Sequence, residues 1–177
     1  MKSIRADPRG FSTLELLVAM LVVIVLALVT APPLVEVVRN SRLTGAARQI
    51  AVDVRQARSQ AVGTGWQYRL IGFSAGASDS RRNHYRVMSR TSAAVAWPSI
   101  SVAPSVGSTL VVGDWVDVGA LFHGIEINPD DSGQFALTFG TRGNPTEVSL
   151  NFSPLRITGE VGRKSVRVST LGSVRVE

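Results

Sequence analysis

The chain has 177 residues, of which 45% are hydrophobic and 18% charged, and it contains no cysteine. These figures exclude a collagenous, a disordered and a disulfide-stapled chain. The absence of thiolates also excludes thiol redox chemistry and cysteine zinc sites. Lysine and arginine outnumber the acidic residues by 19 to 13, which gives a net charge of +6. This charge is compatible with a phosphate or carboxylate partner, but a basic average does not by itself indicate one.

An uncharged apolar segment lies close to the N-terminus. From Leu16 to Ala31 the sequence LLVAMLVVIVLALVTA contains a single polar residue, Thr30. Counted from Phe11, a helix to Ala31 would be about 31 Å long, which matches the hydrocarbon core of a bilayer. The leader at residues 1–10 carries a net positive charge, which places it in the cytoplasm and the residues after Ala31 outside. We therefore expect a single-pass membrane helix.

Two general interpretations of this segment are a plain signal anchor and a cleavable secretory signal peptide. A secretory peptidase would cut after Ala31, but Pro32 and Pro33 follow that position and are unfavourable residues for a peptidase that binds extended chain. Glu15 is the most informative residue of the segment, because an unpaired carboxylate within an apolar span costs a few kcal/mol. An acid in such a place is by default a functional candidate.

The residues around Glu15 read GFSTLE at 10–15 and continue into the apolar run as RGFSTLELLVAM. This order of basic leader, Gly, Phe, Glu and apolar run resembles the prepilin peptidase site of type IV pilins and pseudopilins, which is the third interpretation. The resemblance implies cleavage after Gly10, N-methylation of Phe11 and retention of Glu15. Cleavage would create an ammonium at Phe11, and Glu15 of the same or an adjacent subunit could pair with it, more strongly in hydrocarbon than in water. We therefore expect Glu15 to act in assembly.

The helix is expected to continue past the apolar segment as an amphipathic half. Pro32 and Pro33 should bend it at the outer edge of the membrane, because each lacks an N–H and crowds the preceding turn. Gly63-Thr64-Gly65 should end it. A solvated face is expected on the other side, formed by Arg48, Gln49, Arg55, Gln56, Ser59 and Gln60. The apolar residues recur at three- and four-residue steps and form one core-facing stripe of Leu43, Ala46, Ala47, Ile50, Val54, Ala57 and Ala61.

The rest of the chain predicts antiparallel β-strands, so the fold class is α+β, with one long N-terminal helix packed on antiparallel β-sheets. Clusters of Gly, Pro, Ser, Asn or Asp separate most of the strands. Residues 92–108, with Pro98 and Pro104, predict a surface loop or a short edge strand. The tryptophans at 66, 97 and 115 are expected to anchor the core or loops. The strands are expected at 66–73, 84–89, 109–112, 122–127, 134–139, 147–152, 165–169 and 173–176.

The last two strands repeat Ser-Val-Arg-Val and predict a hairpin of defined register. With residues 170–172 as a three-residue turn, Val168 faces Val174, Val166 faces Val176, and the valines share one face. Gly172 would then take the left-handed position of the turn. The same register sets Arg167 against Arg175 on the outer face, which is unfavourable unless an anion lies between them.

The part of the chain after the apolar segment resembles the GspH/FimT family of pilin-like proteins. The resemblance runs through RNSRLTGAARQIAVDVRQARSQAVGTG at 39–65, where R-x-A-R-S-x-A closes the helix, through LTFGTRGNP at 137–145, and through VRVSTLGSVRV at 166–176. It implies a pilin-like fold and a minor subunit, either the type II secretion pseudopilin H or a FimT-type minor pilin linked to DNA uptake. The expected segments are a cleaved leader (1–10), the transmembrane half of the helix (11–33), its amphipathic half (34–63) and a periplasmic β-rich domain (64–177).

The same resemblance implies a protein that works by assembly and is not an enzyme, without a cofactor. Its expected partners are other pseudopilins or pilins, the prepilin peptidase and methylase, the inner-membrane assembly platform with its ATPase, and membrane lipid. It would be a single-pass inner-membrane protein, with the N-terminus cytoplasmic, until it enters a filament. We favour the secretion pseudopilin, with the DNA-binding minor pilin as the alternative.

DNA-binding FimT proteins carry a Gly-Arg-x-Arg motif at the C-terminal hairpin. Here the corresponding residues are Gly172-Ser173-Val174-Arg175, so the first arginine is missing, and Arg167 could substitute for it in space. Phosphate contacts by such residues would be nonspecific and salt-dependent. The competing interpretation is a solvated basic edge strand that discourages aggregation. The candidate DNA or anion contacts are Arg163, Lys164, Arg167 and Arg175.

Catalytic and metal sites find little support in the sequence. GFSAG at 72–76 matches the G-x-S-x-G nucleophile elbow, but no helical pattern follows it, so we expect a flexible loop rather than a hydrolase site. His84 and His123 have no companion at ligand spacing, and no metal site is expected. Residues 114–131 carry five acidic side chains, and their segment 128–133 predicts a turn rather than a calcium loop. An acidic surface for a basic neighbouring subunit is a further interpretation of 114–131.

Overall fold

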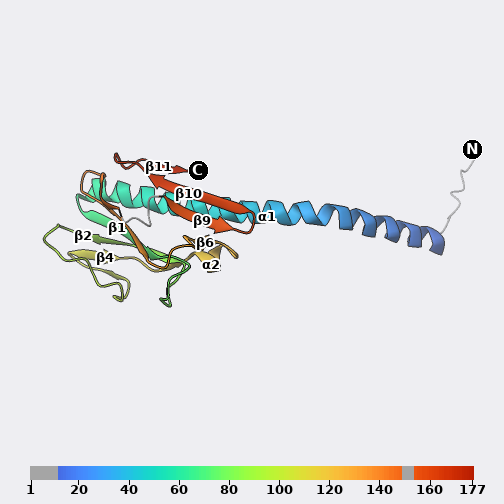
Figure 1. The fold of residues 1–177 in the computed structure, drawn as a ribbon, viewed down its shortest axis with the longest axis horizontal. Coiled ribbons are helices and arrows are strands. Elements are labelled where there is room, and N and C mark those ends of the chain that lie inside the picture. Colours follow the sequence, from blue (N-terminus) through green and yellow to red (C-terminus); the bar gives the residue numbers. More distant parts are fainter. Residues whose placement is uncertain (1–11, 149–153) are drawn as a thin grey trace, which may run out of the picture. The chain divides into compact units, whose positions relative to one another are not determined.

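The computed structural model describes residues 12–148 and 154–177, except for the side chains of residues 28–33. The chain divides into two compact units, Met1–Val38 and Arg39–Glu177. A single helix, α1 (Thr13–Thr64), supplies the described part of the first unit and begins the second. The architecture is α+β, a long N-terminal helix followed by antiparallel sheets, as the sequence predicts (Figure 1).

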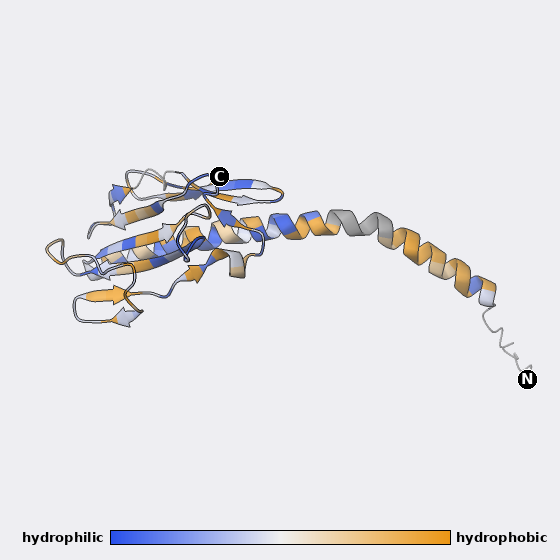
Figure 2. Ribbon diagram, turned by 60° about the horizontal axis from the view of Figure 1, so that its bottom comes forward, coloured by the Kyte–Doolittle hydropathy of each residue, from blue (hydrophilic) through white to orange (hydrophobic). Residues whose placement is uncertain are grey.

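In the first unit, α1 exposes apolar side chains on all its sides. The ribbon of its described part has mostly the colour of hydrophobic residues (Figure 2). Every described residue from Leu14 to Leu26 is exposed, and so are Leu34, Val35, Val37 and Val38. Within the residues that the structure describes, no helix has a stretch that is both long and apolar enough to cross a membrane.

Several predictions for this region fall on residues that the structure does not describe. The leader at 1–10 and the cleavage site at Gly10 and Phe11 lie outside the described residues. The same holds for the side chains of 28–33, which belong to the predicted membrane span at 11–33 and to the bend at Pro32 and Pro33. These points stay predictions.

In the second unit, the remainder of α1 packs through the predicted stripe. All seven residues of that stripe are buried, and Ala51, which the prediction omitted, is buried with them. Small side chains dominate this face, so the backbone of the sheets can approach the helix closely. The helix ends at Thr64, and Gly65 follows with a φ of +69°, the left-handed position that terminates helices. The predicted end is confirmed.

The larger sheet contains, among the described residues, seven antiparallel strands in the order β3-β4-β2-β1-β7-β8, with β5 also paired to β2. The central pairs are β1 with β2 and β1 with β7. Short connections join β3 to β4 and β7 to β8, whereas the other neighbours are joined by longer segments. The strands are β1 (Gln67–Phe73), β2 (His84–Arg90), β3 (Ser105–Val106), β4 (Leu110–Val112), β5 (Val116–Asp117), β7 (Gln134–Phe139) and β8 (Pro145–Val148).

The smaller sheet has the order β11-β10-β9-β6 in the part of the chain that is described. Apolar residues of both sheets form one core cluster with the buried stripe of α1. The helix is therefore the element on which the two sheets meet. The strands are β6 (Glu126–Ile127), β9 (Leu155–Gly159), β10 (Gly162–Val168) and β11 (Val174–Val176), and the short helix α2 (Val118–Leu121) precedes them.

Side chains alternate between the two faces of the larger sheet. Tyr68, Leu70 and Leu137 face α1, while Ile71 and Met88 belong to a second cluster on the other face. Trp97 and Ile100, from the long connection between β2 and β3, pack on this second cluster. The larger sheet is thus covered on both faces, by a helix on one and by a loop on the other.

One polar contact joins α1 to the inner face of the sheet. The buried Tyr85 hydroxyl donates a hydrogen bond to the Asp53 carboxylate, which also accepts from Gln49 one helical turn away. Burial, and then this carboxylate, raise the pKa of Tyr85 above its ordinary value. The phenol therefore stays protonated and keeps donating to Asp53.

The predicted strands are largely confirmed, with the following differences. Residues 122–127 were expected as one strand, but only Glu126 and Ile127 pair, because Asp117 caps α2 by accepting from the Ala120 N–H. The strand β9 was missed. The strand expected at 147–152 begins at Pro145, and residues 149–153 lie outside the described part. The 92–108 connection contains the short edge strand β3, one of its two predicted forms.

The C-terminal hairpin has the predicted register. Val166 pairs with Val176, Val168 with Val174, and Arg167 with Arg175. Gly172 has a φ of +79° and closes the turn by donating to the Ser169 carbonyl. The odd number of loop residues decides this pairing, because any even loop would place arginine opposite valine.

Gly172 should be the most sensitive position of this turn. A Cβ there would overlap the carbonyl oxygen of Gly143, and the backbone is left-handed. We expect Gly172→Ala to lower the free energy of unfolding by about 2 kcal/mol, measured by urea titration of the full chain in detergent. Gly63→Ala is the matched control, since its Cβ meets open space at the end of α1 and should add about 0.5 kcal/mol of stability. Equal effects of the two substitutions would contradict this assignment.

Candidate functional site

Glu15 is the described member of the predicted processing and assembly site. It lies in the first turn of α1, between exposed leucines at 14 and 16. An acid in the first turn is favoured by the helix dipole. The backbone at Glu15 is helical, and the Leu16 N–H donates to the Ser12 carbonyl as the first bond of the helix. The structure thus places the carboxylate on a helix, with apolar residues such as Leu16 and Ala19 beside it toward the C-terminus.

The basic hairpin brings together three of its four predicted residues. Arg163 and Arg167 alternate along β10 and point to the same face, and Arg167 lies directly opposite Arg175 on β11. Lys164 occupies the other face and is half-buried. The three arginines are exposed, so the outer face of the smaller sheet carries a basic patch.

An internal anion partly neutralises this patch. The Arg167 Nε lies 2.9 Å from Oε2 of Glu177, and both side chains are more than half exposed. The sequence predicted that two opposed guanidinium groups would need an anion, and the C-terminal glutamate supplies one. Surface ion pairs of this kind contribute about 1 kcal/mol or less, so an external phosphate could replace it.

Two helix arginines hold the hairpin from behind. Arg58 donates from Nε to the Gly143 carbonyl at 3.0 Å and from Nη2 to the Leu171 carbonyl at 2.9 Å. Arg55 donates to the Val174 carbonyl at 3.1 Å. Sequence reasoning placed Arg55 on a solvated face and assigned no role to Arg58. The R-x-A-R-S-x-A motif was the available signal, because it joins the segments at 137–145 and 166–176.

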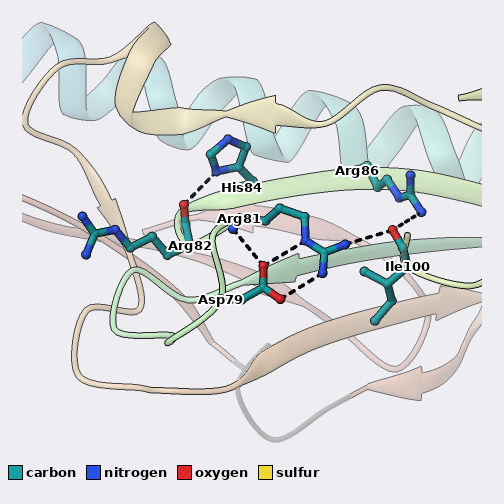
Figure 3. A network of polar contacts seen from close by, with 6 residues as sticks. All are labelled: Asp79, Arg81, Arg82, His84, Arg86 and Ile100. Atoms are coloured by element: carbon teal, nitrogen blue, oxygen red, sulfur yellow. Dashed lines mark hydrogen bonds and ion pairs between the residues drawn. The ribbon is translucent and has the colours of Figure 1, made fainter. Parts of the chain in front are cut away.

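The far face of the larger sheet carries an arginine cluster that the sequence did not reveal. Arg86 is 1% exposed and donates to the carbonyls of Val102, Ser99 and Ile100 at 2.7 to 3.1 Å. Arg81 donates to the Ile100 carbonyl at 3.1 Å (Figure 3). These contacts fasten the 92–104 loop to the strands beneath it.

An acid and aromatic rings complete this arginine cluster. Arg81 makes a two-point ion pair with Asp79, and its hydrogen bonds lower the pKa of that carboxyl to about 2 (Figure 3). The Arg86 guanidinium lies 4.6 Å from the centre of the Trp115 ring. Burial, and then the nearby Arg81, lower the pKa of Arg86. A buried guanidinium costs several kcal/mol to desolvate, which the carbonyls and the ring offset.

A second arginine and tryptophan pair anchors the start of the same loop. Arg90 donates to the Val95 carbonyl at 2.8 Å and lies 4.4 Å from the centre of the Trp97 ring. Arg69 of β1 also lies over Trp97, with its guanidinium carbon 5.3 Å from the centre of that ring. Trp97 and Trp115 are therefore loop anchors, as predicted, and they anchor through cations.

The G-x-S-x-G match does not form a nucleophile elbow. Ser74 is fully buried, and turns rather than a helix follow it. Gly76 faces the Asp131 and Pro129 carbonyls so closely that a Cβ would clash, which explains a glycine here without catalysis. The hydrolase interpretation loses its structural requirement, namely an exposed serine at a strand-to-helix turn.

Two of the five acidic side chains at 114–131 have partners within the fold. Asp117 caps α2 and lies 3.6 Å from the Nε2 of His84, and Asp130 lies 3.5 Å from Arg156. Asn128 accepts from the Arg156 N–H, which ties the start of the 128–133 turn to β9. Across the described ranges, no group of three or more histidine or acidic residues is placed to hold a metal.

Crystal structures of the type IV minor pilin FimU from Pseudomonas aeruginosa, in two crystal forms, resemble this chain at 14% sequence identity. One aligns with a TM-score of 0.45 over 78% of this chain and 90% of that chain. The other aligns with a TM-score of 0.43 over 76% and 92%. No protein-family model and no curated protein matches the sequence.

The arginine cluster predicts a specific loss when Arg86 is removed. We expect Arg86→Met to lower the free energy of unfolding by about 3 kcal/mol, because the carbonyls of Ser99 and Val102 lose this donor and that of Ile100 keeps only Arg81. Amide hydrogen exchange in residues 92–104 should accelerate more than in β1. Arg82→Met removes the same charge from an exposed neighbour and should change neither quantity. Unchanged exchange of the loop in Arg86→Met would show that other contacts hold it.

Proposed function

We propose that this protein is a minor subunit of a type IV pilin-like filament. One observation carries the proposal. The first part of α1 exposes apolar side chains all round, whereas the part after Arg39 buries one stripe under two sheets. Monomeric soluble proteins rarely expose a continuous apolar surface of this size. Such a surface suits a helix that first lies in a bilayer and then packs among the helices of neighbouring subunits in a filament.

The N-terminal sequence supports a maturation step before assembly. In the proposed pathway a prepilin peptidase cuts after Gly10, and the new N-terminus at Phe11 is methylated. Glu15 then meets a positive charge that the uncut chain lacks. The two groups are about one turn apart within a chain, but stacking of helices also brings the Glu15 of one subunit to the Phe11 ammonium of the next. Cleavage would thereby permit assembly.

Among the machines that use such subunits, we favour the type II secretion pseudopilus. The Gly-Arg-x-Arg motif of DNA-binding minor pilins is incomplete here. In addition, Glu177 forms an ion pair with Arg167, one of the candidate DNA contacts. In this proposal the subunit resides in the inner membrane with its β-rich part in the periplasm. Its partners are other pseudopilins, the peptidase and methylase, and the assembly platform.

Replacement of Glu15 tests the proposal. We expect Glu15→Ala to be inserted and cut after Gly10 as usual, but to be reduced at least about tenfold in the sheared filament fraction, since a buried ion pair loses one partner. Mass spectrometry of the N-terminus measures the cleavage, and immunoblotting of filaments measures incorporation. Glu36→Ala removes an exposed carboxylate of the same helix and should incorporate normally. An intact start at Met1, or normal incorporation of Glu15→Ala, would refute this function.

The second candidate function is DNA binding, as in a FimT-type minor pilin. The observation that favours it is the shared outer face of Arg163, Arg167 and Arg175. Arg163 and Arg175 make no ion pair within the described residues, so both are available to phosphates. A strand pair of this kind would contact the DNA backbone without reading its sequence.

A salt titration separates this candidate from a solvated basic strand. If DNA binds here, Arg167→Ala/Arg175→Ala should abolish a gel shift at low salt or reduce its salt slope by about two. Arg82→Ala, compared with the single change Arg175→Ala, is the control for the loss of one charge, because Arg82 is exposed and lies in the connection between β1 and β2. Glu177→Gln should strengthen binding by freeing Arg167. The absence of any shift of the unaltered protein at low salt would exclude this candidate.

A further inference from the structure

A polar groove lies beside the first turns of the second unit. It has a volume of about 280 Å³ and is lined by Arg39, Arg42, His123, Gly124, Ile125 and Glu160. The turn that carries His123 reaches α1 because Gly45 leaves room for the Phe122 ring, which a Cβ at Gly45 would approach to 3.0 Å. The groove is thus built by close packing of the α2–β6 turn on the helix.

The groove has one cation more than it can pair internally. Arg39 and Arg42 are three residues apart on α1, so their side chains lie on the same side of the helix. Arg39 pairs with Glu160 at 2.8 Å, and both side chains are about half exposed. Arg42 makes no hydrogen bond or ion pair within the described part of the chain. An exposed pair such as Arg39 with Glu160 is weak enough for another anion to displace it.

The position of the groove along the helix indicates which anion is at hand. The residues that directly precede Arg39 include the exposed Leu34, Val35 and Val38. If the predicted membrane half of the helix, residues 11–33, spans the bilayer, Arg39 follows the hydrocarbon edge by about 9 Å of helix and Arg42 by about 14 Å. The headgroup layer is about 5 to 8 Å thick, and arginine side chains extend back to it along their apolar stems. Both guanidinium groups can therefore reach phosphates at the membrane surface.

We propose that the groove binds the phosphate of an anionic phospholipid, with Arg39 and Arg42 as its donors. The inference rests on the proposed function, because it requires the apolar segment to lie in a bilayer. Two guanidinium groups on one helix face suit the two free oxygens of a phosphodiester. Glu160 leaves Arg39 when the lipid binds, and Ile125 offers an apolar wall to the glycerol backbone. The lipid would hold the subunit at the membrane surface before assembly.

Native mass spectrometry of the full chain in detergent micelles tests this binding. The chain is mixed with dioleoyl phosphatidylglycerol or, separately, with dioleoyl phosphatidylcholine, and the retained lipid adducts are counted. We expect a preference for phosphatidylglycerol that falls about 25-fold in Arg39→Gln/Arg42→Gln, because each arginine changes binding to an anionic lipid by about fivefold. Glu160→Gln should increase retention of phosphatidylglycerol, since it removes the carboxylate that pairs with Arg39.

Three comparisons decide the outcome. Arg48→Gln/Arg142→Gln removes equal charge at exposed sites away from the groove and should keep the preference. Inorganic phosphate is added as a competitor. Retention of the lipid would support a headgroup site. Full displacement of the lipid would indicate a free-phosphate site and overturn the proposal. Equal retention in Arg39→Gln/Arg42→Gln would overturn it too, and a simultaneous loss of co-purifying pilins would assign the groove to a neighbouring subunit. Carbonate extraction of membranes reports separately on insertion, so failure of the proposed function is distinguishable from failure of this site.

Discussion

The packing of two sheets on one stripe of small residues in α1 is the constraint on which the second unit depends. Ala47, Ala51 and Ala61 are fully buried there, and any larger side chain would push a sheet away from the helix. Because the sheets sit so close, Arg55 and Arg58 can reach carbonyls of the C-terminal hairpin, and Phe122 can fit over Gly45. The basic hairpin and the groove at Arg39 are both consequences of this close packing.

The same helix meets two different requirements along its length. Its first part has apolar residues on every side and no covering element within the described residues, while its second part has a single buried face. Periodicity accounts for the difference, since an amphipathic stripe serves a water-exposed unit and an all-round apolar surface serves lipid or a helical bundle. This division is what makes an assembly subunit the best account of the molecule.

Many of the positively charged side chains of this protein bind groups within the second unit. Arginine makes up all but two of its basic residues, and several of those arginines bind backbone carbonyls: Arg55, Arg58, Arg81, Arg86 and Arg90. A planar guanidinium can satisfy several carbonyls at once, which an ammonium on a flexible stem does less well. The net charge of +6 is therefore a poor guide to external partners, and exposed groups such as Arg42 and Arg175 are the informative ones.

By itself the sequence determined the features that depend on local pattern: the buried stripe and the end of α1 at Gly65, the central strands, and the pairing of Arg167 with Arg175. Each follows from a spacing of three to four residues, an alternation of two, or the length of one turn. Only the tertiary structure decided which distant groups meet. Arg86 finds three carbonyls of a later loop, Asp117 caps a helix where a strand was expected, and Glu177 pairs with Arg167. No periodicity encodes these contacts, because their partners are brought together by the packing of the sheets on the helix.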